Sequence, residues 1–157
     1  MSDSTFLTAA AFEKLKAELE ELTTNGRAEI ERRIQEAREH GDLRENADYD
    51  AAKNDQGLME ARIRQLEALL NTAEVREVED TDEVVVGSLV TVEDEDGDEL
   101  EYFVAPQENK VAGVLLASPT GPLGRALLGA HPGDDVTYKA PAGSFTVKVK
   151  SVRPYTA

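Results

Sequence analysis

Two carboxylates that could do chemistry lie three residues apart, Asp42 and Glu45, between two long helical patterns. If the backbone is helical there, their side chains share one face, with Cβ atoms roughly 5–6 Å apart. Mg²⁺ takes about six oxygen ligands and is usually held by one or two carboxylates, with water and substrate phosphates supplying the rest. The pair could therefore serve a Mg²⁺ site only if the other ligands came from another molecule.

The same spacing also has a structural explanation. Asp-x-x-Glu is typical of a helix start, where Asp42 would accept hydrogen bonds from backbone N–H groups and Glu45 would lie in the first turn. Such helix starts are more common than metal sites, so spacing alone favours capping and leaves metal binding as the alternative.

A long helix is expected before this stretch, from Thr8 to about His40. Its apolar residues are spaced by three or four positions, as in a coiled-coil seam. The step from Leu22 to Ile30 takes eight residues, a stutter that should give a weak or bent segment near residues 23–26. The seam residues are Phe12, Leu15, Leu19, Leu22, Ile30, Ile34 and Ala37.

A second helix is expected to begin between Asp42 and Asn46 and to end near Thr72. Its seam comprises Tyr49, Ala52, Gln56, Met59, Ile63, Leu66, Leu70 and Ala73. The two seams predict an antiparallel coiled-coil hairpin with its tip at about residues 41–48, with Ile30 near Leu58 and Leu22 near Leu66. At about 1.5 Å per residue, the first helix makes an arm about 50 Å long.

Basic residues gather near the predicted tip: Arg33, Arg38, Arg44 and Lys53. Pairing within one helix, such as Arg38 with Asp42, would explain them. Contact with the backbone of a polyanion is the alternative. Spacing favours pairing.

The second half of the chain has the pattern of a small β domain. Short strands are expected at residues 84–86, 89–92, 100–104, 111–116, 136–138 and 145–152, with a short helix over 122–128 that Gly129 ends. The run 93–101 holds seven acidic residues and is expected to be a solvated hairpin loop. The fold class is therefore α+β, with a hairpin domain over 1–76, a linker over 77–83 and a β domain over 84–157.

Composition excludes several kinds of protein. The formal net charge of -15 over 157 residues argues against strong independent DNA binding, because affinity for phosphates comes mostly from Lys and Arg. There is no Cys, no long apolar run and no basic, apolar start, so we expect no membrane span, no signal peptide and a cytoplasmic location. No Ser-His-Asp order, Gly-rich phosphate loop or ligand-spaced His pair suggests an enzyme.

Two stretches resemble the Gre family of bacterial transcription elongation factors. The first runs from Arg38 to Tyr49 and continues with Ala51-Ala52-Lys53 and Gln56-Gly57; it is similar to the signature at the tip of the family's hairpin. The second, Ser118 to Gly129, is similar to the family's serine-x-x-serine-proline-leucine-glycine stretch. The resemblance covers residues 7–152.

The resemblance implies a hairpin that enters the secondary channel of bacterial RNA polymerase and an FKBP-like β domain that docks at the channel rim. Asp42 and Glu45 would help to hold a Mg²⁺ in the polymerase's own active site, an ion that the free protein does not bind. The polymerase would then cleave backtracked RNA near its 3′ end, so the factor is a cofactor and not a nuclease. The docking residues implied are Ser118, Pro119, Pro122, Leu123 and Gly124.

The resemblance also implies that Arg38 and Lys53 contact the 3′ end of the nascent RNA, which makes that role as well supported as pairing. Asp50 stands where the family often has His, and Gly121 replaces a frequent Ser. We expect a monomer.

Three other functions are compatible with the pattern. A channel-blocking transcription inhibitor would lack cleavage stimulation, but the retained acidic pair argues against it. A plain coiled-coil adaptor would use the acids only as caps. A prolyl isomerase is suggested only by the FKBP-like fold, and fold does not imply function.

Overall fold

The computed structural model describes residues 4–40 and 46–156. Contacts divide the chain into two compact units, one of residues 12–72 and the other of residues 4–11 with 73–156. Asp42 and Glu45 lie outside the described residues, as does the predicted pairing of Arg38 with Asp42.

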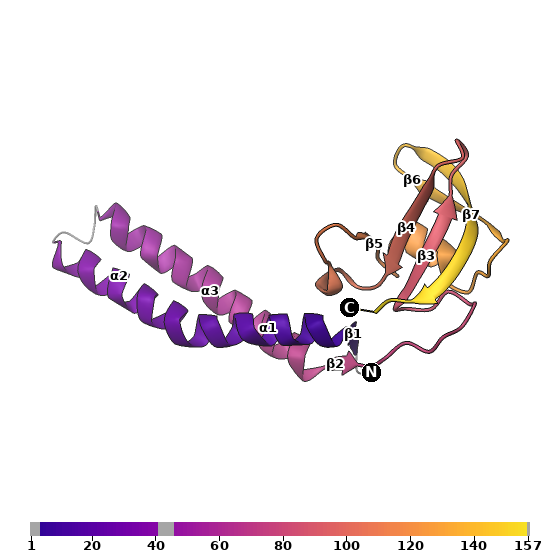
Figure 1. Cartoon of the computed structure of the whole chain (residues 1–157). Coiled ribbons are helices and arrows are strands. Elements are labelled where there is room, and N and C mark those ends of the chain that lie inside the picture. Colours follow the sequence, from indigo (N-terminus) through magenta and orange to yellow (C-terminus); the bar gives the residue numbers. More distant parts are fainter. Residues whose placement is uncertain (1–3, 41–45, 157) are drawn as a thin grey trace. The chain divides into compact units, whose positions relative to one another are not determined.

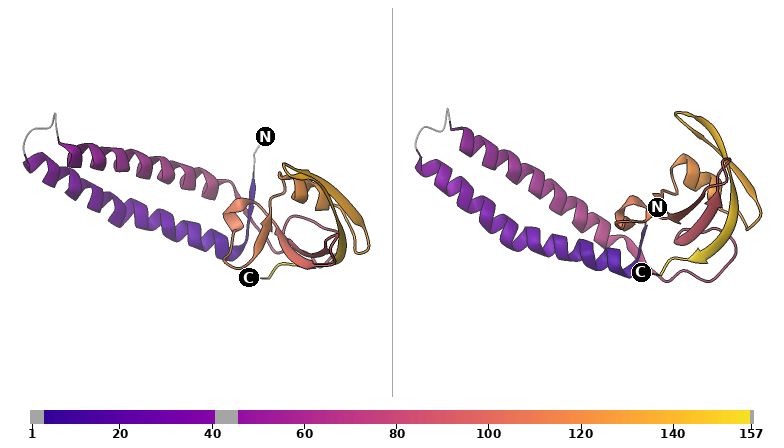
Figure 2. Two further views of the ribbon diagram at one scale, coloured as in Figure 1. Left: turned by 90° about the horizontal axis from the view of Figure 1, so that it is seen from above. Right: turned by 45° about the horizontal axis from the view of Figure 1, so that its top comes forward.

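The helical unit is an antiparallel hairpin. Helix α1 (Ala9–Glu21) continues through a π-helical segment (Leu22–Gly26) into α2 (Arg27–Glu39), and α3 (Ala47–Asn71) runs back beside them (Figures 1 and 2). The hydroxyl oxygen of Thr8 accepts a hydrogen bond from the Ala11 N–H at 3.0 Å, which caps α1 where the sequence predicted its start. The predicted coiled-coil hairpin is confirmed.

The π-helical segment occupies the predicted stutter. Its wider turn lets eight residues separate the seam positions Leu22 and Ile30 without a break in the helix. Backbone carbonyl oxygens beside this segment accept hydrogen bonds from side chains. The Thr23 hydroxyl donates to Leu19 O at 2.9 Å and the Thr24 hydroxyl donates to Glu20 O at 2.7 Å. The expected irregularity is therefore present, as a widened turn.

The seam of the hairpin is narrow. Ile30, Ile34 and Ala52 form one buried cluster, against which Tyr49 and Met59 pack. The predicted contact of Ile30 with Leu58 is wrong, because Leu58 is 65% exposed and the next residue, Met59, faces the seam instead.

The β unit contains a five-stranded sheet in the order β5-β4-β3-β7-β6. Strands β4 and β5 are parallel and the other neighbours are antiparallel. The long strand β7 pairs with both β3 and β6, with an irregularity opposite Thr91 and Val92, so the sheet curls. The bounds are β3 Ser88–Glu93, β4 Glu99–Val104, β5 Leu115–Ala117, β6 Asp135–Ala140 and β7 Gly143–Pro154.

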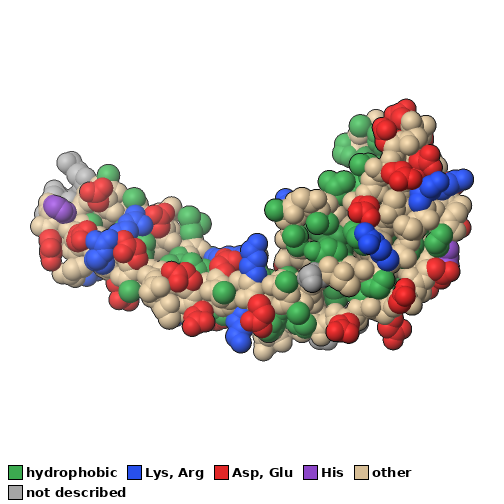
Figure 3. Space-filling model, in the orientation of Figure 1, with side chains coloured by type: hydrophobic (Ala, Val, Ile, Leu, Met, Phe, Trp, Pro, Cys, Tyr) green, Lys and Arg blue, Asp and Glu red, His purple; other side chains and the backbone are tan. Residues whose placement is uncertain are grey.

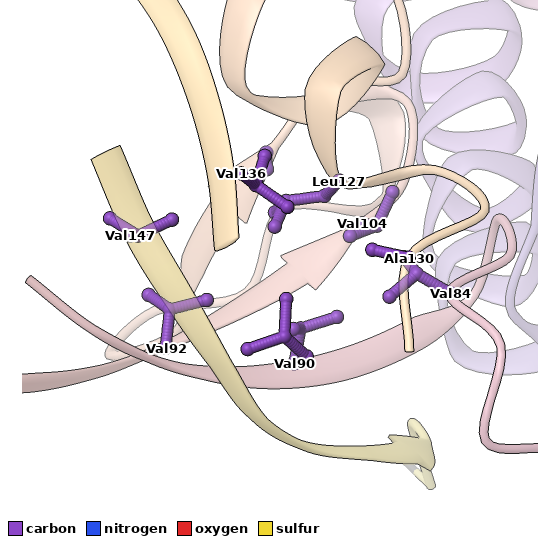
Figure 4. Close-up of a cluster of buried hydrophobic side chains, with 10 residues drawn as sticks. Val84, Val90, Val92, Val104, Leu127, Ala130, Val136 and Val147 are labelled. Carbon is purple, nitrogen blue, oxygen red and sulfur yellow. The ribbon is translucent and has the colours of Figure 1, made fainter. Parts of the chain in front are cut away.

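The short helix α4 (Pro122–Leu127) lies against the sheet and closes the core. The core cluster has ten buried residues (Figure 4); among them Val90, Val104 and Leu127 are fully buried, and Val136 and Val147 come from the neighbouring strands β6 and β7. Gly129 follows α4 with φ +86°, a conformation that favours glycine, so the predicted helix and its stop are confirmed. Together the hairpin and the sheet confirm the α+β class.

Two short parallel strands were not predicted, β1 (Thr5–Leu7) and β2 (Ala73–Val75). Each has three residues, too few for a period-2 pattern to stand out. Phe6 packs against Phe103 and Ala105 of the sheet domain. Residues 4–11 therefore pack with the β unit, although the sequence assigned residues 1–76 to the hairpin domain.

Two predicted strands differ in the structure. Residues 84–86 form no strand; the Val84 N–H donates to Ala130 O and Val84 O accepts from Gly129 N–H, both at 2.9 Å, in a loop pairing. The strand predicted over 111–116 is shorter and later, at Leu115–Ala117. Within residues 4–40 and 46–156, no helix is long and apolar enough to cross a membrane.

Candidate functional site

Asn46 joins the two arms of the hairpin near the predicted tip. Its backbone is extended and its side-chain oxygen accepts a hydrogen bond from the Tyr49 N–H at 3.0 Å, so Asn46 is the N-cap of α3. Its side-chain nitrogen donates to the carbonyl oxygen of Ala37, in the last turn of α2, at 2.5 Å. One amide thus joins the end of α2 to the start of α3.

This cap bears on the structural explanation for the acidic pair. Asn46 performs the capping of α3 that the spacing had suggested for Asp42, and α3 begins at Ala47. Asp42 and Glu45 precede this N-cap in the chain and belong to the residues that the structure does not describe.

Basic side chains lie on both helices near the tip. Arg38 is in the last turn of α2, with its guanidinium carbon 6.0 Å from the centre of the Tyr49 ring. The Lys53 ammonium donates to Gln56 at 3.0 Å, and Arg33 pairs with Asp55 at 3.0 Å. Acidic and basic side chains are interspersed over the hairpin (Figure 3).

Several ion pairs join the two arms of the hairpin. Arg62 holds the carboxylate of Glu18 at 2.7 and 2.9 Å, and this hydrogen bonding lowers the pKa of Glu18. Arg27 likewise binds Glu60 through two nitrogens at 2.9 and 3.0 Å, which lowers the Glu60 pKa. These exposed pairs bridge the two arms of the hairpin.

The second motif lies at the start of α4. The Ser118 carbonyl oxygen accepts from the Gly121 N–H at 3.0 Å, and the hydroxyls of Ser118 and Thr120 are 3.0 Å apart. Gly124 is buried directly against this turn; a Cβ on Gly124 would overlap the Ser118 carbonyl oxygen and lie 2.6 Å from its carbonyl carbon. Glycine is therefore required at this position to keep the turn packed on the helix.

Two hollows flank this turn. One, of about 510 Å³, is lined in part by Ser118 and Pro119 together with residues of β1 and β2. The other, of about 480 Å³, lies between α4 and β6 and is lined in part by Pro122 and Tyr138. Of the predicted docking residues, Ser118 and Pro119 line the first hollow and Pro122 lines the second, whereas Leu123 packs toward the core and Gly124 is buried.

Among the described residues, no group of three or more His, Asp or Glu side chains could hold a metal ion. The described part of the chain therefore offers no metal centre of its own.

Comparison with known proteins identifies the family. Residues 5–75 match the model for the N-terminal part of transcription elongation factors, and residues 79–154 match the model for the C-terminal part of GreA and GreB. The chain belongs to the GreA/GreB family of transcription elongation factors. Its match to the family covers both compact units.

Individual proteins similar to this chain carry the same family name. The chain is 44% identical to the transcription elongation factor GreA of Streptomyces coelicolor, with 96% of this chain and 94% of that protein covered. It is 47% identical to GreA of Saccharopolyspora erythraea, with 97% and 96% covered. The crystal structure of GreA factor homolog 1 of Thermus thermophilus shares 29% identity and covers 96% of this chain and 99% of that chain, with a TM-score of 0.45.

GreA/GreB factors act as cofactors of RNA polymerase and are not enzymes in their own right, so this chain is a transcription elongation factor whose partner is RNA polymerase. The roles of Asp42, Glu45, Arg38 and Lys53 stay predictions.

The structural roles of two residues, Asn46 and Asn109, were not predicted from the sequence. The bridging role of Asn46 depends on a bond to Ala37, nine residues away, although Asn before a helix is a recognised capping signal. Asn109 is buried and binds the start of the chain: its amide donates to Phe6 O and accepts from the Thr8 N–H, both at 2.8 Å. No spacing rule connects residues so far apart.

Proposed function

We propose that this factor inserts its hairpin into the secondary channel of RNA polymerase and stimulates the polymerase's own cleavage of backtracked RNA. In this mechanism Asp42 and Glu45 lend carboxylate oxygens to a Mg²⁺ in the polymerase active site. Two-metal centres clamp the attacking and leaving oxygens during phosphodiester hydrolysis. Carboxylates are ligands that Mg²⁺ prefers, and the ion keeps several positions for water and phosphate.

One observation carries the proposal. The chain segment with both carboxylates connects α2 to α3 at the tip of a coiled-coil arm, and Asn46 already caps α3. The carboxylates are therefore not needed to start the helix. A group offered at the end of an arm can complete a metal site that belongs to another macromolecule.

The remaining residues support parts of the same mechanism. Arg38 and Lys53 lie on the two helices next to the tip, within reach of an RNA 3′ end brought to the same place. The turn of Ser118 and Pro119, with Pro122, Leu123 and Gly124 of α4, would dock at the channel rim. We infer that the factor acts as a monomer, beside the polymerase in the bacterial cytoplasm.

The test is a cleavage assay on purified polymerase stalled in a backtracked complex. The factor should release short 3′ RNA fragments, and Asp42→Ala with Glu45→Ala should abolish the release while binding to polymerase persists. A matched control is Glu13→Gln with Glu20→Gln, which removes two exposed carboxylates from α1, far along the chain from the tip.

Two results would contradict the proposal. Undiminished cleavage by the Asp42 and Glu45 variant would show that the carboxylates are dispensable. Slower nucleotide addition without fragment release by the unaltered factor would identify a channel-blocking inhibitor.

A further inference from the structure

The hollow between α4 and β6 reverses the charge of the surface around it. Arg125 of α4 and Lys139 of β6 both line it, and both residues are exposed. Hydroxyl and apolar side chains line the rest, among them Thr120, Thr137 and Pro122. Of the described residues that line this hollow, none is acidic, although the formal net charge of the chain is -15. The hollow therefore has the charge of a site for an anionic group.

Other cations of the β unit are already neutralised within the chain. Lys150 pairs with Glu93 at 3.1 Å, and Arg153 pairs with Glu101 at 2.9 Å. Within residues 4–40 and 46–156, no such ion pair joins a carboxylate to either cation of the hollow. These two positive charges can therefore meet an anion from another molecule without first giving up a partner in this chain.

The surroundings favour a protein carboxylate over a nucleic acid backbone. The hydroxyls of Thr137 and Thr146 are 2.9 Å apart, and the Thr146 N–H donates to Glu95 at 3.1 Å, so the acidic run 93–101 lies close to the hollow. Duplex DNA carries one charge per about 1.7 Å of its axis, and this run would repel its phosphates. A guanidinium, in contrast, can bind a single carboxylate through two parallel hydrogen bonds.

We propose that Arg125 and Lys139 bind an acidic segment on the surface of RNA polymerase when the β unit docks. This inference rests on the proposed docking at the channel rim and adds the chemistry of the partner surface. Pro122, one of the predicted docking residues, lines the same hollow, so apolar and charged contacts would meet at one place. Complementary charges across an interface speed the encounter and fix the register of the partners.

The experiment measures the affinity of the full-length factor for purified core polymerase free of nucleic acid. Arg125→Gln with Lys139→Gln removes both charges and keeps long polar side chains. We expect binding to weaken by about tenfold at roughly 0.1 M salt and by less at roughly 0.5 M, where charges are screened more strongly. Because both residues are exposed, the melting temperature should stay close to that of the unaltered factor.

Lys150→Gln with Arg153→Gln is the matched control. It changes the net charge of the same unit by the same amount, but it removes cations that already have partners in the chain. Its affinity for core polymerase should stay close to that of the unaltered factor. Equal losses of affinity in the two double variants would overturn the inference, since the effect would then follow net charge alone.

Two further results separate this inference from its rivals. Unchanged binding to core polymerase, with weaker binding to a complex loaded with nucleic acid, would overturn it and assign the two cations to phosphates. If the loss of affinity is confirmed but the unaltered factor releases no RNA fragments from stalled complexes, the docking role is supported and the proposed cleavage mechanism is refuted.

Discussion

Gly124→Ala tests whether the turn at Ser118 and the helix α4 form one packed unit. The added methyl would overlap the Ser118 carbonyl oxygen and come within 2.6 Å of its carbonyl carbon and 3.1 Å of the Pro119 nitrogen. All three atoms belong to the backbone, which cannot rotate away as a side-chain end can. The turn or the helix must therefore shift.

The expected magnitude follows from two opposing effects. Forcing an extra methyl group into a packed site costs about 1–3 kcal/mol, and backbone overlap places this case toward the upper end. Replacing Gly by Ala inside a helix returns at most about 1 kcal/mol. We expect a net loss of about 1–2 kcal/mol, which corresponds to a fall of roughly 4–16 °C in the melting temperature of a domain this size.

Gly121→Ala is the matched control. A Cβ at Gly121 would lie 3.5 Å from the same carbonyl oxygen, an ordinary contact, and its φ of −84° suits any residue. Calorimetry of the β-unit transition and a polymerase-binding assay should show a loss for Gly124→Ala and little change for Gly121→Ala. Equal melting temperatures and equal affinities for the two variants would refute the reasoning.

Three further changes have predicted effects on stability. Gly87→Ala should cost about 1–3 kcal/mol, because φ is +104° and a Cβ would overlap the Val78 side chain. Asn109→Ala should cost about 1–3 kcal/mol, because the buried backbone groups bound by its amide lose their partner. Glu18→Gln should cost less than about 1 kcal/mol at pH 7, since the pair with Arg62 is partly exposed. Because hydrogen bonding to Arg62 lowers the Glu18 pKa below 4.5, that contribution is present above this pH and is lost as the pH falls below it.

The free energy of unfolding of all three variants can be measured by chemical denaturation. Gly113→Ala, at φ +82° with no neighbour within 4 Å, isolates backbone strain from the overlap at Gly87, so equal losses at the two positions would refute the packing argument. An Asn109→Ala variant as stable as the parent would show that its bonds contribute nothing. For Glu18→Gln, the difference from the parent should shrink on acidification from pH 7 to pH 3; a growing difference would contradict the sign.

The helical half could be predicted from the sequence because its apolar residues recur at regular spacing. Apolar spacing predicted both arms, and the eight-residue step from Leu22 to Ile30 predicted the irregular turn that the structure shows as a π-helical segment. The predicted seam included Met59, which does pack against the cluster of Ile30, whereas the predicted pairing of Ile30 with Leu58 named a residue outside that seam, and Leu58 is exposed.

The β half could be predicted only in part, because its short strands depend on partners that are far away in the sequence. Strands β1 and β2 are stabilised by pairing with each other and by the burial of Phe6 against Phe103. The candidate site shows the same limit. The motif around Asp42 and Glu45 stands out in the sequence, but the amide of Asn46 binds Ala37 through a contact that no local pattern encodes.

The central claim, that the tip lends ligands to a Mg²⁺ held by the polymerase, is tested most directly by the Mg²⁺ dependence of cleavage. Fragment release from stalled complexes should be measured across Mg²⁺ concentrations at saturating factor, for the parent chain, Asp42→Asn and Glu45→Gln. A higher Mg²⁺ midpoint for both variants, with unchanged polymerase binding, is the predicted result. An identical midpoint in all three proteins would contradict the claim.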